Sequence, residues 1–97
     1  MPVTILSKRL FKIDQKDEIL PQLKKLREQA KKQKGFISRG TFSSLNDPGE
    51  YMVISEWESV ENWKKWMDKK ETRKIQAKID SLIGEKTFFD VYLPEEY

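Results

Sequence analysis

Three tryptophans, Trp57, Trp63 and Trp66, lie within one stretch of ten residues and are the only tryptophans of the chain. Tryptophan has the largest side chain, and its indole N–H needs a hydrogen-bond partner when the ring is buried. So dense a group forms either a heavily packed part of the core or the aromatic wall of a pocket. Such a wall suits a small hydrophobic or aromatic molecule, with an indole N–H as hydrogen-bond donor.

Two residue types that commonly carry chemistry are missing. The chain contains no histidine and no cysteine, and these are the usual protein ligands of zinc and other transition metals. A serine nucleophile would have no histidine base, and the four glycines stand alone rather than in a phosphate-binding loop. We therefore expect no metal and no cofactor, and no disulfide stabilises the domain.

The elements that must position the tryptophans can be predicted from periodicity. Alternating apolar and polar residues predict strands at residues 3–13, 36–43, 51–57 and 87–93, and apolar residues at three-and-four spacing predict helices at residues 16–33, 60–70 and 72–83. Ser59 suits the N-cap of the second helix. With the last two helical stretches taken together, the order is β-α-β-β-α-β. This order predicts one α+β domain over residues 1–97, a ferredoxin-like antiparallel sheet with its helices on one face.

The second face of this sheet also carries apolar side chains. In the third predicted strand Met52 and Ile54 alternate with Tyr51, Val53 and Trp57, so both sides of the strand are apolar. A sheet covered by helices on one side only normally has a polar second face. We therefore predict a homodimer in which two sheets pack against each other.

The order of elements and the segment Trp57-Glu-Ser-x-Glu-x-Trp63-x-x-Trp66 resemble the antibiotic biosynthesis monooxygenase superfamily, whose members are dimeric α+β barrels. Gly35-Phe36 after the first helix is a second similar feature. The resemblance implies a homodimer and a cofactor-independent monooxygenase that acts on a small aromatic or quinol-type substrate. In such enzymes the substrate reduces oxygen after the protein has bound it, helped to deprotonate it and excluded water.

That chemistry requires a few hydrogen-bonding groups that favour the anion of the substrate. The resemblance implies Trp66, Asn62 and Arg73 as catalytic candidates, and Ser7, Arg9, Arg39, Trp57 and Gln76 as substrate-binding candidates. Each has a simpler structural explanation as well. Trp57 suits the core, Arg73 can pair with an acidic neighbour at the surface, and Ser7 can bond locally. Arg9 and Arg39 can both point inward only if each is paired, because an uncompensated buried charge is costly.

Two alternatives remain beside this reading. The spacing of Trp57 and Trp66 is similar to that in the haem-degrading branch of the superfamily, whose asparagine and iron-binding histidine correspond to Ser7 and Gln76 here. Glutamine is a poor iron ligand, so haem degradation would need a substituted ligand. The other alternative is a non-enzymatic, small-molecule-binding or stress-associated dimer that kept the scaffold and lost the reaction.

The charge pattern argues against other partners. Nineteen Lys and Arg residues balance sixteen Asp and Glu residues to a net charge of +3, and the two signs are interleaved. This gives no basic patch of the kind that binds nucleic acid. The amino-terminal residues lack the pattern of a signal peptide, and no apolar stretch reaches the roughly twenty residues of a membrane span. We expect a cytoplasmic protein that binds neither nucleic acid nor membrane.

Overall fold

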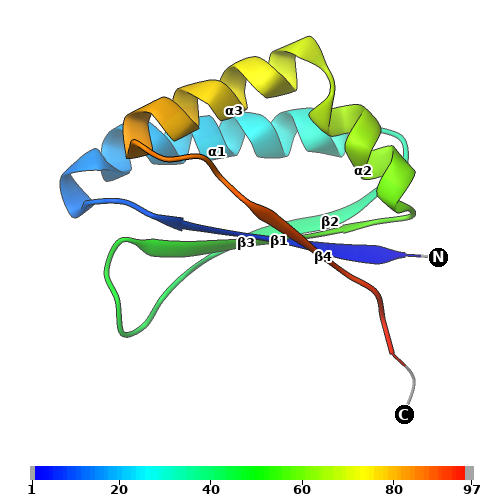
Figure 1. Ribbon diagram of the computed structural model, residues 1–97, viewed down its shortest axis with the longest axis horizontal. Helices are drawn as coiled ribbons and strands as arrows, with labels where there is room; N and C mark the ends of the chain where they lie inside the picture. Colours follow the sequence, from blue (N-terminus) through cyan, green and yellow to red (C-terminus); the bar gives the residue numbers. More distant parts are fainter. Residues whose placement is uncertain (1, 96–97) are drawn as a thin grey trace.

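The computed structural model describes residues 2–95. It contains the strands and helices β1 (Val3–Leu10), α1 (Lys16–Lys31), β2 (Phe36–Ser43), β3 (Glu50–Trp57), α2 (Val60–Met67), α3 (Lys70–Ile83) and β4 (Phe89–Tyr92), and a short 3-10 helix, η1 (Ile13–Gln15). The strands form one antiparallel sheet in the order β2-β3-β1-β4, and all three α-helices lie on one side of it (Figure 1). The predicted ferredoxin-like α+β fold is confirmed.

Two strands are shorter than their periodicity predicts. The prediction that the first strand runs to residue 13 is wrong, because β1 ends at Leu10. The next residue, Phe11, donates its backbone N–H to the Gly49 carbonyl at 2.9 Å, and the chain then turns into η1. Gly49 has a φ of +94°, and a β-carbon there would collide with the Phe11 carbonyl oxygen. The last strand also starts later than expected, at Phe89.

The helices follow their predicted positions closely. α1 packs Ile19, Leu23, Leu26 and Ala30 into the core from one side. Ser59 caps α2 as predicted, since its hydroxyl accepts the Asn62 backbone N–H at 3.2 Å. Within residues 2–95, none of the helices combines the length and hydropathy that a bilayer span requires.

The layer between the sheet and the helices changes character along β1. Val3 and Ile5 at one end are buried apolar residues, whereas the next two residues on the same side, Ser7 and Arg9, are buried and polar. Their neighbours on β3 across this side are Val53 and Tyr51. One half of the layer is therefore an ordinary hydrophobic core, and the other half holds buried polar side chains.

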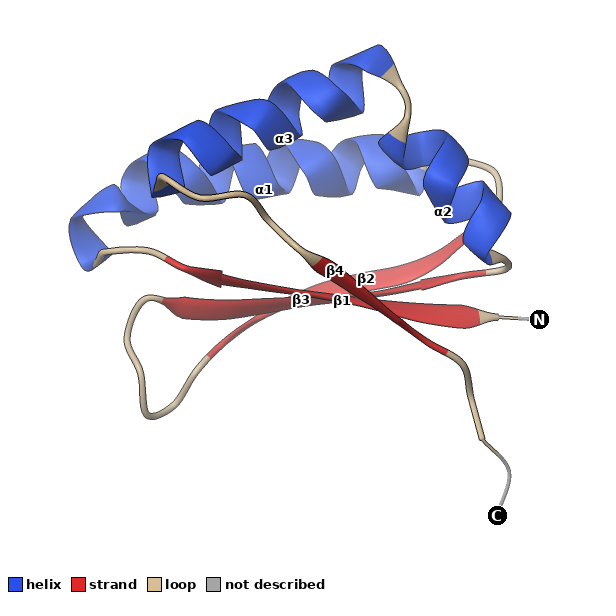
Figure 2. Cartoon of the chain, in the orientation of Figure 1, coloured by secondary structure: helices blue, strands red, loops and turns tan. Residues whose placement is uncertain are grey.

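The opposite side of the sheet is not covered by the described residues (Figure 2). The cross-strand pairs Leu6–Ile54 and Met52–Phe42 lie on this side, together with Leu10 and Tyr92. Leu10, Phe42 and Tyr92 each expose more than half of their surface. An exposed apolar surface of this kind is typical of an interaction site.

Candidate functional site

Two of the tryptophans form an aromatic stack between α2 and the sheet. Trp57 at the end of β3 and Trp66 in the last turn of α2 stack with ring centroids 5.4 Å apart, and Phe36 meets Trp57 edge-on at 5.5 Å. Both indoles are buried, with 0% and 2% of their surface exposed. The Trp57 indole N–H donates to the Ser55 hydroxyl at 3.3 Å. Trp57 thus acts as a core residue, and it supports Trp66.

Arg39 brings a cation to this stack. Its guanidinium carbon lies 5.6 Å from the centroid of the Trp66 ring, which is a cation–π contact. Arg39 faces the helices because β2 has a bulge: Phe36 pairs with Trp57, and the register shifts before Ser38 pairs with Glu56. In a regular strand two residues three apart point to opposite faces, so without the bulge Phe36 and Arg39 could not share this side.

Arg9 lies in a hydrogen-bonded network that links β1 to α3. Its guanidinium donates to the Ser7 hydroxyl and to the Gln76 side-chain oxygen, both at 3.2 Å. The Gln76 amide donates in turn to Asp80 at 2.9 Å. The same Asp80 oxygen accepts the Thr87 hydroxyl at 2.6 Å and the Thr87 backbone N–H at 3.2 Å. Arg9, with 3% of its surface exposed, is thereby coupled to a carboxylate through Gln76.

The two arginines differ in how their charge is compensated. Burial lowers the pKa of Arg9 from its ordinary value to about 10, and Asp80 acts in the opposite direction. Burial lowers the pKa of Arg39 as well, and together with the positive charges of Arg9 and Arg27 it brings this pKa to about 10. Within residues 2–95, no carboxylate pairs with Arg39. Among residues 2–95 neither arginine forms a direct ion pair: Arg9 is hydrogen-bonded to the neutral Ser7 and Gln76, and Arg39 contacts the Trp66 ring.

Two buried N–H groups in this region lack a partner in the described part of the chain: Nε of Arg9 and Nε1 of Trp66. Buried donors are nearly always satisfied in native proteins, and an orphaned one needs an explanation such as a ligand. We use the name donor cluster for Arg9, Arg39 and Trp66. Its groups are all donors, so the arrangement suits an acceptor or an anion.

The other candidates lie apart from the donor cluster or support it. Asn62 is used at the start of α2, where its side-chain oxygen accepts the Ser59 hydroxyl at 2.6 Å. It also packs so tightly on Gly35 that a β-carbon there would collide with it. Arg73 is exposed and pairs with Asp68 at 3.5 Å. Ser7 and Gln76 hold Arg9, as described above. The structure therefore gathers these candidates in two groups. Trp57 and Arg39 contact Trp66, and Ser7 and Gln76 bind Arg9. The two groups are near enough for the charge of Arg9 to act on Arg39, and Asn62 and Arg73 lie outside both.

Sequence reasoning missed two residues that position the cluster. Ser55, which receives the Trp57 N–H, is a buried serine two residues before the tryptophan on the same side of β3. Asp80, which anchors Gln76, lies four residues after it on α3. The strand period of two places Ser55 on the side of Trp57, and the helical spacing of four places Asp80 on the side of Gln76. Neither period indicates which side of these elements is polar and buried.

The side chains that correspond to the haem-binding positions do not fit haem. Both ends of the Gln76 amide are bonded, to Arg9 and to Asp80, so its oxygen is committed to another residue. The Ser7 hydroxyl is likewise bound by Arg9. In the part of the chain that the structure describes, no three His, Cys, Asp or Glu side chains are grouped as metal ligands.

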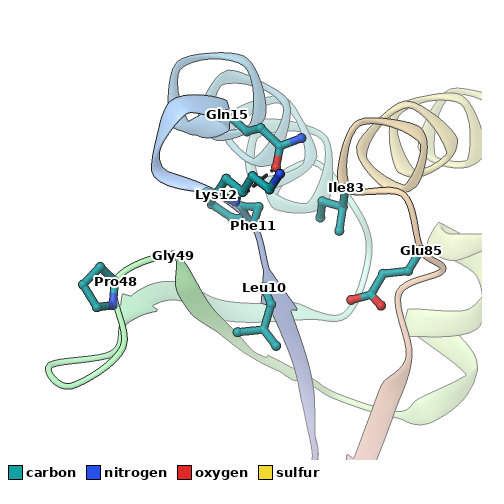
Figure 3. A pocket seen from close by; sticks show the side chains of 8 residues that line it. All are labelled: Leu10, Phe11, Lys12, Gln15, Pro48, Gly49, Ile83 and Glu85. Atoms are coloured by element: carbon teal, nitrogen blue, oxygen red, sulfur yellow. Dashed lines mark hydrogen bonds between the residues drawn. The ribbon is translucent and has the colours of Figure 1, made fainter.

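A cavity of about 260 Å³ opens between α1 and β2, lined by Leu20, Leu23, Lys24, Arg27 and Thr41. Thr41 lies two residues beyond Arg39 on the same side of β2, so this cavity lies next to the donor cluster. A larger hollow, of about 590 Å³, lies at another end of the fold and is shown in Figure 3. None of the predicted site residues lines that hollow.

The fold and site can be compared with known proteins. The family model for antibiotic biosynthesis monooxygenases matches residues 2–78. The chain belongs to this family. The match covers both tryptophans of the stack, Arg9, Arg39 and Gln76. Among curated proteins, no relative matches the chain.

Solved structures of this monooxygenase fold cover almost all of the chain. A conserved protein from Methanosarcina mazei Go1 superimposes with a TM-score of 0.90 at 18% identity, over 98% of this chain and 94% of that one. SnoaB from Streptomyces nogalater, described as a cofactor-independent oxygenase, gives 0.87 at 10% identity over 99% and 95%. Rv0793 from Mycobacterium tuberculosis gives 0.86 at 14% identity over 100% and 98%. At these identities the likeness concerns the fold.

Proposed function

We propose that this member of the antibiotic biosynthesis monooxygenase family is a cofactor-independent monooxygenase that acts on a small aromatic or quinol-type substrate. The observation that carries the proposal is the donor cluster, in which the buried N–H groups of Arg9 and Trp66 have no partner among the described residues. Preorganised donors of this kind stabilise negative charge that develops on a substrate. The family match and the fold shared with SnoaB support the same activity.

The reaction draws its electrons from the substrate. Donors around a phenol oxygen lower its pKa, so the phenolate forms and releases its proton to solvent. The electron-rich ring then reduces O2. One oxygen atom bonds to a ring carbon and becomes a carbonyl, and the O–O bond breaks. The second oxygen atom leaves as water. The two hydrogens of this water equal in number the one lost from the phenol and the one lost from the ring carbon, so the reaction balances.

Each residue of the site has a separate role in this proposal. Trp66 Nε1 and the Arg9 guanidinium face the developing oxyanion, while Ser7 and Gln76 fix the orientation of Arg9. The Trp57 ring holds Trp66 in place by stacking. The low dielectric of the buried layer strengthens each of these interactions relative to water.

One observation favours a second candidate function. Asn62 and Arg73, two of the three catalytic candidates, lie outside the donor cluster. A non-enzymatic dimer that binds a small aromatic molecule in the same place would need only the cluster and its cavity. A direct assay of turnover separates the two functions.

The assay is oxygen uptake with 1-naphthol as the probe, in buffer saturated with ¹⁸O2. We expect uptake in proportion to protein concentration, with one ¹⁸O atom in the naphthoquinone product. Trp66→Phe keeps an aromatic ring and removes the N–H, and we expect it to lower kcat about a hundredfold. Trp63→Phe is the matched control, because Trp63 packs edge-on against Phe89, outside the cluster, and we expect a change within about twofold.

Two results would contradict the proposal. Uptake that does not depend on the protein, together with a thermal shift by 1-naphthol, would identify a binder without turnover. Equal activity of Trp66→Phe and the wild type would remove Trp66 from the mechanism.

The uncovered side of the sheet supports a further part of the proposal, a homodimer. A second copy that packs on the side carrying Leu6, Phe42, Met52 and Ile54 would bury the exposed apolar surface in both subunits. This sheet-to-sheet contact leaves the donor cluster on the other side of each sheet.

A further inference from the structure

Arg39 carries a partly buried charge that the described chain does not neutralise. Its guanidinium lies on the Trp66 ring, with no carboxylate paired to it in the described residues. Arg27 and Arg9 are near enough for their charges to lower its pKa. Proteins bury an arginine beside other arginines only at a cost. An anion that binds there would remove this cost.

The cavity between α1 and β2 has a matching chemistry. Leu20 and Leu23 supply an apolar wall, and Lys24 and Arg27 supply two further cations. Thr41, which also lines the cavity, lies about 7 Å along β2 from Arg39, the length of two strand residues. A volume of about 260 Å³ accommodates one or two aromatic rings, and it is too small for an extended polycyclic molecule.

We infer that the ligand of this site is an aromatic acid with one or two rings, whose ring lies against Leu20 and Leu23 in the cavity and whose carboxylate reaches Arg39, beside the lining residues of the cavity. This inference rests on the proposed function, because it names the substrate class of the same site. A phenol hydroxyl next to the carboxylate then faces the donor cluster.

The charges favour an acid over a neutral quinol. A neutral ring would leave Arg39 without an anion and would add nothing to offset Arg9 and Arg27. A carboxylate accepts two N–H groups of one guanidinium side by side, a geometry that makes arginine its preferred partner. Arg39 is thus a specificity-determining residue, and Arg9 remains bound to Ser7 and Gln76.

The test uses a matched pair of probes, 1-hydroxy-2-naphthoate and its methyl ester, which differ in charge at one group. Isothermal titration calorimetry measures the affinity of each for the full chain. For the wild type we expect the acid to bind at least about tenfold more tightly than the ester, the increment of one charge-assisted contact. We expect Arg39→Met to bring the ratio close to one.

A control variant separates a local contact from net charge. Lys78→Met removes one positive charge from an exposed position on α3, and we expect it to keep the preference for the acid. Should Arg39→Met fail to fold in a thermal unfolding assay, Arg39→Gln replaces it. The ratio of the affinities for acid and ester in the wild type tests the inference even if neither variant folds.

The outcomes distinguish this inference from the proposed function. Equal affinity for acid and ester in the wild type overturns the inference, and so does a preference for the acid that survives in Arg39→Met. Oxygen uptake with both probes at equal affinity retains the monooxygenase and rejects the acid. A preference for the acid without oxygen uptake retains the ligand class and rejects the monooxygenase.

Discussion

At the scale of single residues, the buried Arg9 and the partly buried Arg39 show how the same side chain takes two roles. Arg9 is bound by neighbours on two elements and is coupled to Asp80 through Gln76. Arg39 contacts the Trp66 ring and faces two other positive charges. Sites that bind or react with ligands often reduce the stability of the free protein in this way. The loss of folding stability that Arg39 causes in the free protein should therefore be measurable.

We predict that Arg39→Met raises the free energy of unfolding by about 1 kcal/mol while it removes the preference for an acid. Replacement of buried charged pairs by apolar side chains ranges from neutral to a gain of roughly 1–4 kcal/mol. Arg39, a partly buried charge without a carboxylate partner in the described residues, lies on the favourable side of this range, and the lost cation–π contact costs roughly 0.5–1 kcal/mol. Urea denaturation at pH 7 measures the difference. A lower stability of the variant would show that Arg39 is a structural residue.

The pKa of Arg39 gives the same prediction a pH dependence. Its value in the folded protein, about 10, is below the ordinary value of an arginine. The unfolded chain therefore binds more protons between these two values, and the stability of the wild type rises with pH there. Below pH 10 Arg39 is charged in the folded protein, so its charge lowers the free energy of unfolding by the full amount. The advantage of Arg39→Met should accordingly narrow as the pH rises above 10.

At the scale of elements, α3 organises the site although it contributes no residue to the donor cluster. Gln76 and Asp80 are four residues apart on this helix and therefore lie on one side of it. Gln76 reaches Arg9 on β1, and Asp80 reaches Thr87 in the segment before β4. The helix thus fixes β1 and the last connection relative to each other. Asp80 is the residue on which this arrangement depends.

We predict that Asp80→Ala lowers the free energy of unfolding by roughly 2–3 kcal/mol, because it leaves two Thr87 donors and the Gln76 amide without their acceptor and Arg9 without its carboxylate. Asp68→Ala is the matched control. Asp68 pairs with Arg73 at the surface, and loss of an exposed pair costs about 0.5 kcal/mol or less. Urea denaturation compares the two. Similar small losses would show that the network is dispensable.

At the scale of the whole molecule, the two sides of the sheet have different tasks. The helices cover one side of the sheet (Figure 1), and that side holds the core and the donor cluster. The other side exposes Phe42, Leu10 and Tyr92. A domain of 97 residues buries only about two thirds of its unfolded surface. Burial of the second side in a homodimer would therefore add substantially to stability.

We predict that Phe42→Lys weakens the homodimer about a hundredfold or more, because a twofold interface receives the new charge from both subunits. Leu45→Lys is the control, since Leu45 lies in the loop between β2 and β3 with 98% of its surface exposed. Sedimentation velocity at micromolar concentration measures the mass of each variant. A monomeric wild type would rule out the homodimer, and an unchanged Phe42→Lys variant would place the interface elsewhere.

The sequence by itself determined the elements of this protein and their order. The alternation in residues 36–43, the cap at Ser59 and the three-and-four spacing of α1 and α3 are local patterns, and each follows from the geometry of a few adjacent residues. The order of elements and the tryptophan segment together predicted the family as well. The first strand was predicted too long because the bond between Phe11 and Gly49 joins residues far apart in the sequence.

Only the tertiary structure decided which residues form the site. Arg39 faces the helices because of the bulge after Phe36, and Arg9 meets Gln76 across 67 positions of the chain. Asn62 and Arg73 were equally plausible candidates by sequence, and local partners hold both of them away from the cluster. Periodicity is a property of neighbours along the chain, whereas the burial and pairing of a charge depend on elements that meet only when the chain folds.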